Sequence, residues 1–227
     1  MMRDAGPKLV IFDCDGTLVD SGAVIHACMT RAFAGAGLEP PTLAAPHGVI
    51  GLSLDYAIAR LLAREPDMLV GELTEAYKRH FLTIRSEPDF SEPLYDGIAA
   101  LIDGLAARDD IVLGMVTGKS RRGVQAVFAT HGFGPRFMVV RTADDCPSKP
   151  HPAMVLECCA EAGFDPASTT VVGDAIYDFV MARSAGARAV GVGWGYHDRT
   201  ALEAAGAYAV LSRPSDLLPM LGLAEIA

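Results

Sequence analysis

Several features are scarce in this 227-residue chain, and each scarcity excludes a class of protein. No apolar run approaches the ~20 residues needed to cross a bilayer, so we expect no membrane association. The first seven residues lead directly into a short apolar run at 9–12, which is too short for the core of a signal peptide. Cysteine is limited to five residues without paired C-x-x-C spacing, which argues against a disulfide framework and a structural zinc site. These features together favour a cytoplasmic protein.

Positive charge is also in short supply. Nineteen Lys and Arg residues stand against 28 Asp and Glu residues, for a formal net charge of -9. An acidic protein repels nucleic acid unless a local basic patch intervenes, and the densest basic spot in the helix-like segments is the pair Arg121-Arg122. We therefore expect no nucleic acid among the partners.

Apolar residues, in contrast, make up 51% of the chain, which is ample for a buried core. In the second half, short β-branched runs alternate with amphipathic helix-like segments, the pattern of a parallel sheet with helices on both faces. The expected strands are residues 9–12, 111–116, 137–140, 170–172, 187–192 and 207–211. The expected helices are residues 120–131, 152–162, 177–185, 200–205 and 215–221. This predicts an α/β fold with a doubly wound, Rossmann-like, mostly parallel sheet.

The alternation breaks between the first strand and residue 111. Residues 19–92 contain no convincing strand, only helix-like stretches at 24–36, 54–63 and 73–84 separated by Gly and Pro. We interpret residues 19–92 as an inserted all-helical domain, with residues 1–18 and 93–227 forming the α/β core.

The strongest motif is Asp13-Cys14-Asp15-Gly16-Thr17, directly after the first expected strand. Alternate side chains of an extended segment share a face, so both carboxylates can point together. Two adjacent acids repel, and the pair therefore favours a divalent cation or a shared proton. The alternative is an Asp-rich turn with solvated carboxylates.

Three further motifs also follow expected strands. Thr117-Gly118 offers a hydroxyl and an approachable amide that suit a phosphate oxygen, although Thr-Gly is also a common turn. Lys149 precedes Pro150, a placement that favours extended backbone and a fixed direction for the lysine, although most lysines lie on the surface. The third is a pair of acids four residues apart, Asp174 and Asp178, which suit Mg²⁺ or, singly, a helix cap.

The joint pattern carries more weight than any one motif. Ligands of open α/β sheets bind outside the carboxyl ends of the strands, and all four motifs fall there. The sequence therefore predicts one cleft that combines carboxylates, a hydroxyl, a lysine and a cation site.

These motifs resemble those of the haloacid dehalogenase superfamily of phosphohydrolases. The resemblance covers nearly the whole chain and rests on Asp13-x-Asp15-Gly16-Thr17-Leu18-Val19-Asp20-Ser21, Thr117-Gly118, Lys149-Pro150, and Gly173-Asp174 with Asp178. The helical insertion resembles the small cap of the phosphoglycolate phosphatase-like branch, as do residues 51–54, 192–196 and 208–218. Two positions depart from the family pattern, namely Gly118, where many relatives carry Asn or Ser, and Ala175, where a hydroxyl residue is frequent.

The resemblance implies a role for each motif residue. Asp13 would be the nucleophile that forms an aspartyl-phosphate, Asp15 the general acid and base, and Lys149 a catalytic cation that steadies both nucleophile and phosphate. The implied phosphate-binding residues are Asp13, Gly16, Thr117, Gly118 and Lys149. The implied Mg²⁺ ligands are Asp13, Asp15 through its backbone carbonyl, Asp174 and, as a ligand or a support, Asp178.

The expected activity is Mg²⁺-dependent hydrolysis of a small phosphomonoester, phosphoglycolate-like or a sugar phosphate, by a monomer or homodimer. A phosphomutase of the β-phosphoglucomutase type would retain every motif residue and stays open as an alternative. A dehalogenase has no leaving group that needs a proton, so the acid at Asp15 favours phosphate chemistry over dehalogenation. Two non-enzyme alternatives are a phosphate-binding module and a signalling receiver, although a receiver is a single domain of ~120 residues without reason for such an insertion.

Overall fold

A six-stranded parallel sheet forms the centre of the computed structural model, which describes residues 6–223. The strand order is β3-β2-β1-β4-β5-β6, with all pairs parallel. The strands are β1 (Lys8–Phe12), β2 (Ile111–Val116), β3 (Val139–Arg141), β4 (Thr169–Gly173), β5 (Arg188–Val192) and β6 (Ala209–Leu211). The predicted α/β fold is confirmed, and every strand bound lies within two residues of the expected one.

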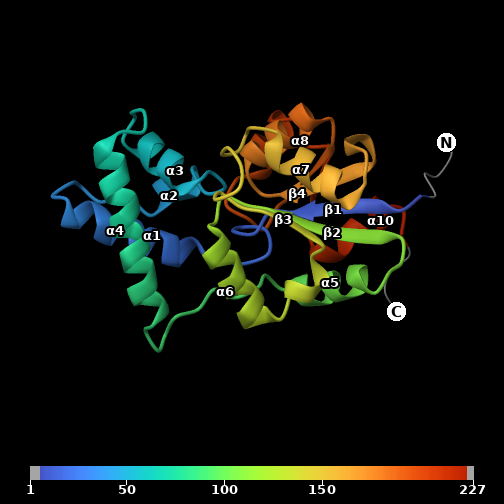
Figure 1. Cartoon of the computed structure of the whole chain (residues 1–227), viewed down its shortest axis with the longest axis horizontal. Helices are drawn as coiled ribbons and strands as arrows, with labels where there is room; N and C mark the ends of the chain where they lie inside the picture. The colour runs from blue at the N-terminus through green and yellow to red at the C-terminus, as the bar shows by residue number, and fades with distance from the viewer. Residues whose placement is uncertain (1–5, 224–227) are drawn as a thin grey trace.

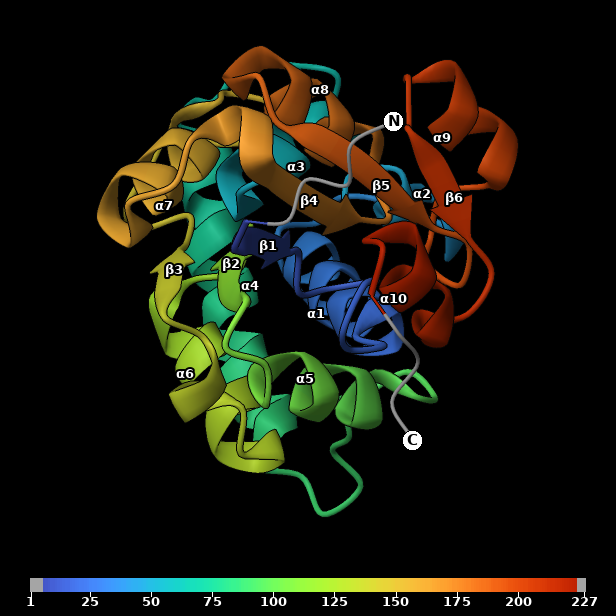
Figure 2. The same cartoon turned by 90° about the vertical axis from the view of Figure 1, so that its right-hand side faces the viewer.

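Helices cover both faces of this sheet (Figure 2). Alternation along β1 supplies both interfaces, because Val10 and Phe12 pack in one apolar cluster while Leu9 and Ile11 pack in another. The first cluster includes residues of α5 (Ile98–Ala106), α6 (Arg121–His131) and α10 (Leu217–Met220); the second includes residues of α7 (Ala153–Ala162), α8 (Ile176–Ala185) and α9 (Arg199–Ala204). Helix α5 was not predicted; it lies in the segment that connects α4 to β2.

Four helices lie at one end of the sheet, apart from those on its faces (Figure 1). They are α1 (Gly22–Gly35), α2 (Ala44–His47), α3 (Leu54–Leu61) and α4 (Met68–Arg85), and they enclose an apolar cluster of their own that includes Met29, Ile58 and Leu73. Because this group has its own core, we propose that residues 19–92 form a cap domain on a core of residues 1–18 and 93–227. Within residues 6–223, none of the helices combines the length and apolar character that a bilayer crossing requires.

Helix α4 begins five residues earlier than the sequence pattern predicts. Asp67 accepts a hydrogen bond from the Val70 amide at 3.0 Å and caps the helix at Met68. The early start adds more than one turn to the long helix that faces the core, and α4 forms much of the wall of the site described next.

Candidate active site

The four sequence motifs meet at the carboxyl edge of the sheet. Asp13 follows β1, Thr117 follows β2 and Asp174 follows β4. The parallel register sets these strand ends side by side, since Phe12 pairs with both Met115 and Val172. The Asp13 amide donates to the Val172 carbonyl at 2.9 Å, which fixes the backbone where the first motif leaves the sheet.

A buried lysine joins two of the motif carboxylates. Lys149 Nζ lies 2.8 Å from Asp13 Oδ1 and 2.7 Å from Asp178 Oδ1, and all three side chains are at most 1% exposed. Burial alone would lower the pKa of Lys149, but the adjacent Asp13 and Asp178 carboxylates hold it above its ordinary value. The lysine therefore stays charged beside the predicted nucleophile.

Three of these carboxylates form a group suited to a divalent cation. One oxygen each from Asp13, Asp174 and Asp178 lies within 4.8 Å of the others. Three acids face one ammonium group, so the buried cluster carries surplus negative charge when ionised. Apart from the ion pair with Lys149, neither carboxylate oxygen of Asp13 has a hydrogen-bond partner within residues 6–223. Hard oxygen donors with surplus charge and open positions fit Mg²⁺.

The raised pKa values of Asp174 and Asp13 also favour a cation site. Burial, followed by the Asp178 carboxylate, raises the pKa of Asp174 from 3.8 to about 7. Burial also raises the pKa of Asp13 well above its ordinary value, although Lys149 opposes that rise. A cation bound between such carboxyl groups would stabilise their ionised forms, which burial alone disfavours.

Asp174 and Asp178 are held by different partners. Asp174 accepts hydrogen bonds from Thr17 Oγ1 at 3.2 Å and from the Tyr196 amide at 2.8 Å. Asp178 uses one oxygen for Lys149 and the other to accept the Ala175 amide at 3.1 Å, at the start of α8. Asp178 therefore positions Lys149 and caps a helix at the same time. Asp174 directly follows β4, and Asp178 lies in the first turn of α8.

Gly16 serves the turn between the two motif acids and the linker to the cap. Its φ of +84° is a conformation that side chains rarely adopt, and an added Cβ would overlap the Asp174 carboxylate. Its amide donates to the Val19 carbonyl at 2.9 Å. The amide is thus occupied within the turn, so Gly16 contributes backbone shape and close approach rather than a donor aimed at phosphate.

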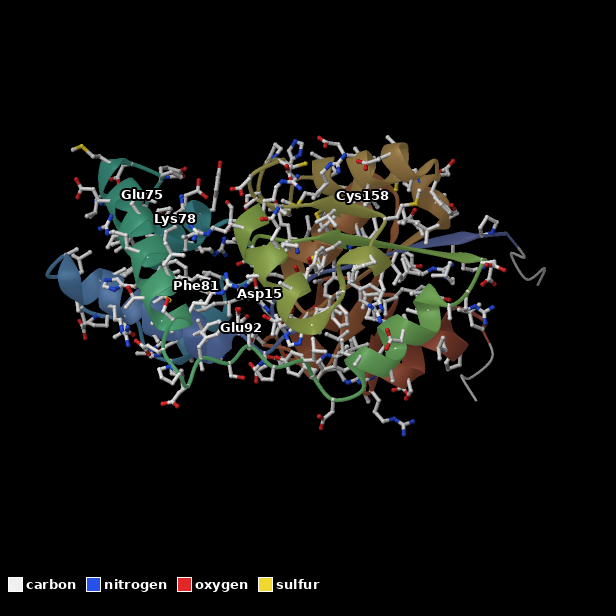
Figure 3. All side chains as sticks on the ribbon, turned by 60° about the horizontal axis from the view of Figure 1, so that its bottom comes forward. Asp15, Glu75, Lys78, Phe81, Glu92 and Cys158 are labelled. Atoms are coloured by element: carbon white, nitrogen blue, oxygen red, sulfur yellow. The ribbon has the colours of Figure 1, made fainter. Side chains whose placement is uncertain are left out.

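Asp15 lies in a separate polar cluster between core and cap (Figure 3). Its Oδ1 accepts hydrogen bonds from Ser21 at 2.6 Å and from Lys119 Nζ at 2.7 Å. Lys119 Nζ also lies 3.1 Å from Glu92 Oε1 and 5.7 Å from the centre of the Phe81 ring. Burial would lower the pKa of Lys119, but the Asp15 and Glu92 carboxylates hold it well above the ordinary value. Lys119 thereby links Asp15 to α4 and to the returning linker.

Sequence reasoning gave Lys119 no role of its own. Its position directly after Thr117-Gly118 was the available signal. Its partners Asp15 and Glu92 are 104 and 27 residues away in sequence, and only the folded linkers bring them together.

The loop between α2 and α3 docks directly on the core. The Ser53 amide donates to Ser148 Oγ at 2.9 Å, and the Tyr177 hydroxyl donates to the Gly48 carbonyl at 2.8 Å. A Cβ added at Gly118 would overlap the Leu52 carbonyl. Gly118 is small because the cap loop occupies the space beside it.

A cavity of about 700 Å³ lies between cap and core. Asp13, Asp15, Thr117 and Gly118 form part of its wall on the core side. The core also contributes residues from 119–123 and 143–148, and the cap contributes residues of α1, α3, α4 and the α2–α3 loop. A molecule in this cavity would contact the candidate nucleophile and the cap together.

The chain was compared with known proteins. The profile of the haloacid dehalogenase-like hydrolase family matches residues 10–192. Phosphoglycolate phosphatase 1 of Pseudomonas aeruginosa is 31% identical, over 94% of this chain and 79% of that protein. The N-acetylmuramic acid 6-phosphate phosphatase of the same organism is 29% identical, over 94% of both chains.

Solved structures give the same assignment. A hydrolase from Pseudomonas syringae superposes with a TM-score of 0.83 at 26% identity, covering 95% of this chain and 98% of that one. The six-stranded sheet, the strand-end motifs and these similarities agree. The chain therefore belongs to the haloacid dehalogenase-like hydrolase family, in its phosphoglycolate phosphatase-like branch, and is a phosphatase of that family.

Proposed function

We propose that this protein is a Mg²⁺-dependent phosphatase that hydrolyses a small phosphomonoester through an aspartyl-phosphate on Asp13. The observation that carries the proposal is the buried contact of Asp13 with Lys149 at the wall of a cavity that also holds Asp15. Phosphoryl transfer depends mainly on positioning and charge stabilisation, and these three side chains supply both.

In the first step, a carboxylate oxygen of Asp13 attacks phosphorus and the bond to the leaving oxygen breaks. Asp15 gives its proton to that oxygen, so the product leaves as a neutral alcohol. Thr117 and the Gly118 amide hold phosphate oxygens, while Lys149 balances charge on Asp13 and the transferring group. The leaving group departs into the cavity under the cap.

In the second step, water hydrolyses the aspartyl-phosphate. Asp15, now ionised, takes a proton from the water as it attacks phosphorus, and the bond from phosphorus to the Asp13 oxygen breaks. This restores the Asp13 carboxylate and releases inorganic phosphate. Two displacements replace one difficult displacement, because a mixed anhydride hydrolyses readily.

The residues that would hold Mg²⁺ are Asp13, Asp174 and the Asp15 backbone carbonyl, with Asp178 as a supporting residue. The ion would supply positive charge to the phosphate oxygens, where negative charge accumulates during transfer. The fit rests on the Asp13 oxygens, which have no partner besides Lys149 within residues 6–223, and on the surplus charge of the buried cluster.

We further propose that the partner is a small phosphorylated metabolite in the cytoplasm and that the enzyme acts as a monomer or homodimer. Phosphoglycolate and sugar phosphates are the first candidates, since relatives are named for phosphoglycolate and for a sugar 6-phosphate. A screen of small phosphate esters with and without Mg²⁺ tests the function. Mg²⁺-dependent phosphate release supports it, whereas no release from any ester contradicts it.

Mg²⁺ binding is expected to weaken as pH falls below about 7. The pKa of Asp174 lies at about 7 without metal, so at lower pH the ion must displace a proton. From pH 8 to pH 5 the apparent affinity should fall roughly a hundredfold. Calorimetric titration of Mg²⁺ across this range checks the prediction, and an affinity independent of pH would refute it.

The same pKa makes the metal-free protein less stable at higher pH. A carboxyl whose pKa rises from 3.8 to about 7 on folding stabilises the fold fully below 3.8, and this contribution is lost as pH rises through 7. Mg²⁺ should therefore raise the unfolding temperature more at pH 8 than at pH 5. In Asp174→Asn, which lacks this titrating group, that difference should become smaller.

Gly118→Ala is expected to lower kcat/KM by about tenfold or more. The added methyl would overlap the Leu52 carbonyl and displace the cap loop from the core, which misplaces the substrate. Gly71→Ala is the matched control, because a Cβ there meets no atom within 4 Å. Equal kcat/KM in the two variants would show that the loop contact does not matter for turnover.

A further inference from the structure

One face of α4 forms a long wall of the cavity. Thr74, Tyr77, Phe81 and Arg85 are spaced three or four residues apart, so they lie on the same side of the helix, and all four line the cavity. At 1.5 Å per residue this wall is about 16 Å long. It exceeds the reach of a phosphate ester with only two carbons.

Part of the remaining wall is apolar. Met29 of α1 and Ile50 of the α2–α3 loop line the cavity and are 2% and 6% exposed. The rings of Tyr77 and Phe81 are stacked with centres 6.5 Å apart. Ile50 lies outside the apolar clusters of the described residues, so its buried side chain serves the cavity rather than the cap core.

The two lysines that line the cavity are already paired with carboxylates. Lys119 contacts the carboxylates of both Asp15 and Glu92, which offset its charge. Lys78 of α4 also lines the cavity, away from Asp15, and pairs with Glu75 at 2.8 Å (Figure 3). A carboxylate on a short substrate would therefore meet paired cations beside the reacting phosphate.

Two arginines also line the cavity, but neither is buried. Arg122 is exposed and Arg85 is half-buried, and attraction between charges in water contributes little. Three further cap residues, Arg60, Arg64 and His47, contact Tyr177, Asp67 and Tyr196 and are not among the residues that line the cavity.

The wall also holds a hydroxyl that lacks a partner. Thr74 Oγ1 is buried and makes no hydrogen bond within the described part of the chain. Buried polar groups are nearly always paired, so this hydroxyl favours one polar atom on an otherwise apolar bound molecule. It lies on the same helix face as Tyr77 and Phe81.

From these features we infer that the preferred substrates are phosphomonoesters whose leaving alcohol carries an apolar body of about six carbons or a ring, rather than a two-carbon acid. This inference rests on the proposed phosphatase function and adds the class of leaving group. The apolar body lies along α4 and against Ile50, while the phosphate reaches Asp13 and Thr117.

Unbranched alkyl phosphates from ethyl to hexyl test the inference, because the chemistry of the leaving oxygen is nearly constant while the buried apolar area increases. Each added CH₂ should raise kcat/KM about threefold, or roughly 80-fold across the series. Hexyl phosphate should also exceed phosphoglycolate. A flat or falling series, with phosphoglycolate preferred, would overturn the inference and leave the phosphatase function standing.

Two variants and a binding measurement complete the test. Ile50→Asn should flatten the dependence on chain length, whereas Met68→Asn, at a cap residue that is 82% exposed and outside the cavity wall, should retain it. Calorimetry with the non-hydrolysable ethylphosphonate and hexylphosphonate needs no turnover. Hexylphosphonate should bind at least about tenfold more tightly. Equal binding would reject the inference even if no ester were hydrolysed.

Discussion

Asp13→Asn is expected to lower kcat/KM by more than about a thousandfold, equivalent to ~4 kcal/mol of barrier. The amide retains the shape of the carboxylate but is a poor nucleophile and forms no stable acyl phosphate. Asp13 is the carboxylate at the end of β1 that touches Lys149 and lines the cavity. Kinetics with the best ester from the screen, at saturating Mg²⁺, measure the loss.

The fold should survive this substitution. Asp13 is fully buried and burial raises its pKa, so the neutral amide removes a charge that the interior disfavours. The unfolding temperature of Asp13→Asn without metal should therefore not fall at pH 8. Asp89→Asn, at an exposed residue of the linker that returns to the core, is the matched control and should keep wild-type kcat/KM. Wild-type rates in Asp13→Asn would refute the nucleophile assignment.

Lys149→Met is expected to lower kcat/KM by at least about a hundredfold. Its ammonium is the buried cation shared by Asp13 and Asp178. Removing one partner of a buried ion pair leaves an uncompensated charge and typically costs ~3–5 kcal/mol. In this site two carboxylates would lose their common partner, and Asp13 would hold a proton instead of attacking phosphorus.

Lys119→Met provides the discriminating comparison, because Lys119 contacts Asp15 rather than Asp13. The ratio kcat/KM reports steps up to phosphoryl transfer, and Asp15 is needed there to protonate a poor leaving group. Lys119→Met should thus be impaired with an alkyl phosphate and far less with 4-nitrophenyl phosphate, whose leaving group needs no proton. Lys149→Met should lose a similar factor with both esters. The same leaving-group dependence in both variants would contradict the separate roles.

The sheet and its motif edge were predictable because several local signals agree. The apolar run before Asp13 is buried on both faces, as expected for a central parallel strand. Parallel strands end at one edge, so residues that follow different strands, such as Asp13, Thr117 and Asp174, lie together even though they are far apart in sequence. Strand ends identified from β-branched runs were therefore enough to predict a common cleft.

Other features depend on contacts that no local pattern records. Helix α2 has four residues, too few for a recognisable period, and the α2–α3 loop takes its place from contacts with Ser148 and Tyr177. The cluster of Lys119 with Glu92 requires both the cap and its return linker. Gly118 stood out in the sequence as a departure from the family pattern, whereas in the fold an added Cβ would overlap the Leu52 carbonyl. Each of these contacts joins the cap to the core. The local sequence of either part does not specify which residues of the other part it will contact.

The most direct test of the account is to trap the phosphorylated residue during turnover. Rapid quenching followed by borohydride reduction converts an aspartyl-phosphate to homoserine, which mass spectrometry of peptides then locates. We predict homoserine at position 13 in the wild-type chain and none in Asp13→Asn. Steady turnover without any trapped acyl phosphate, or homoserine at Asp15 or Asp174 instead, would contradict the mechanism.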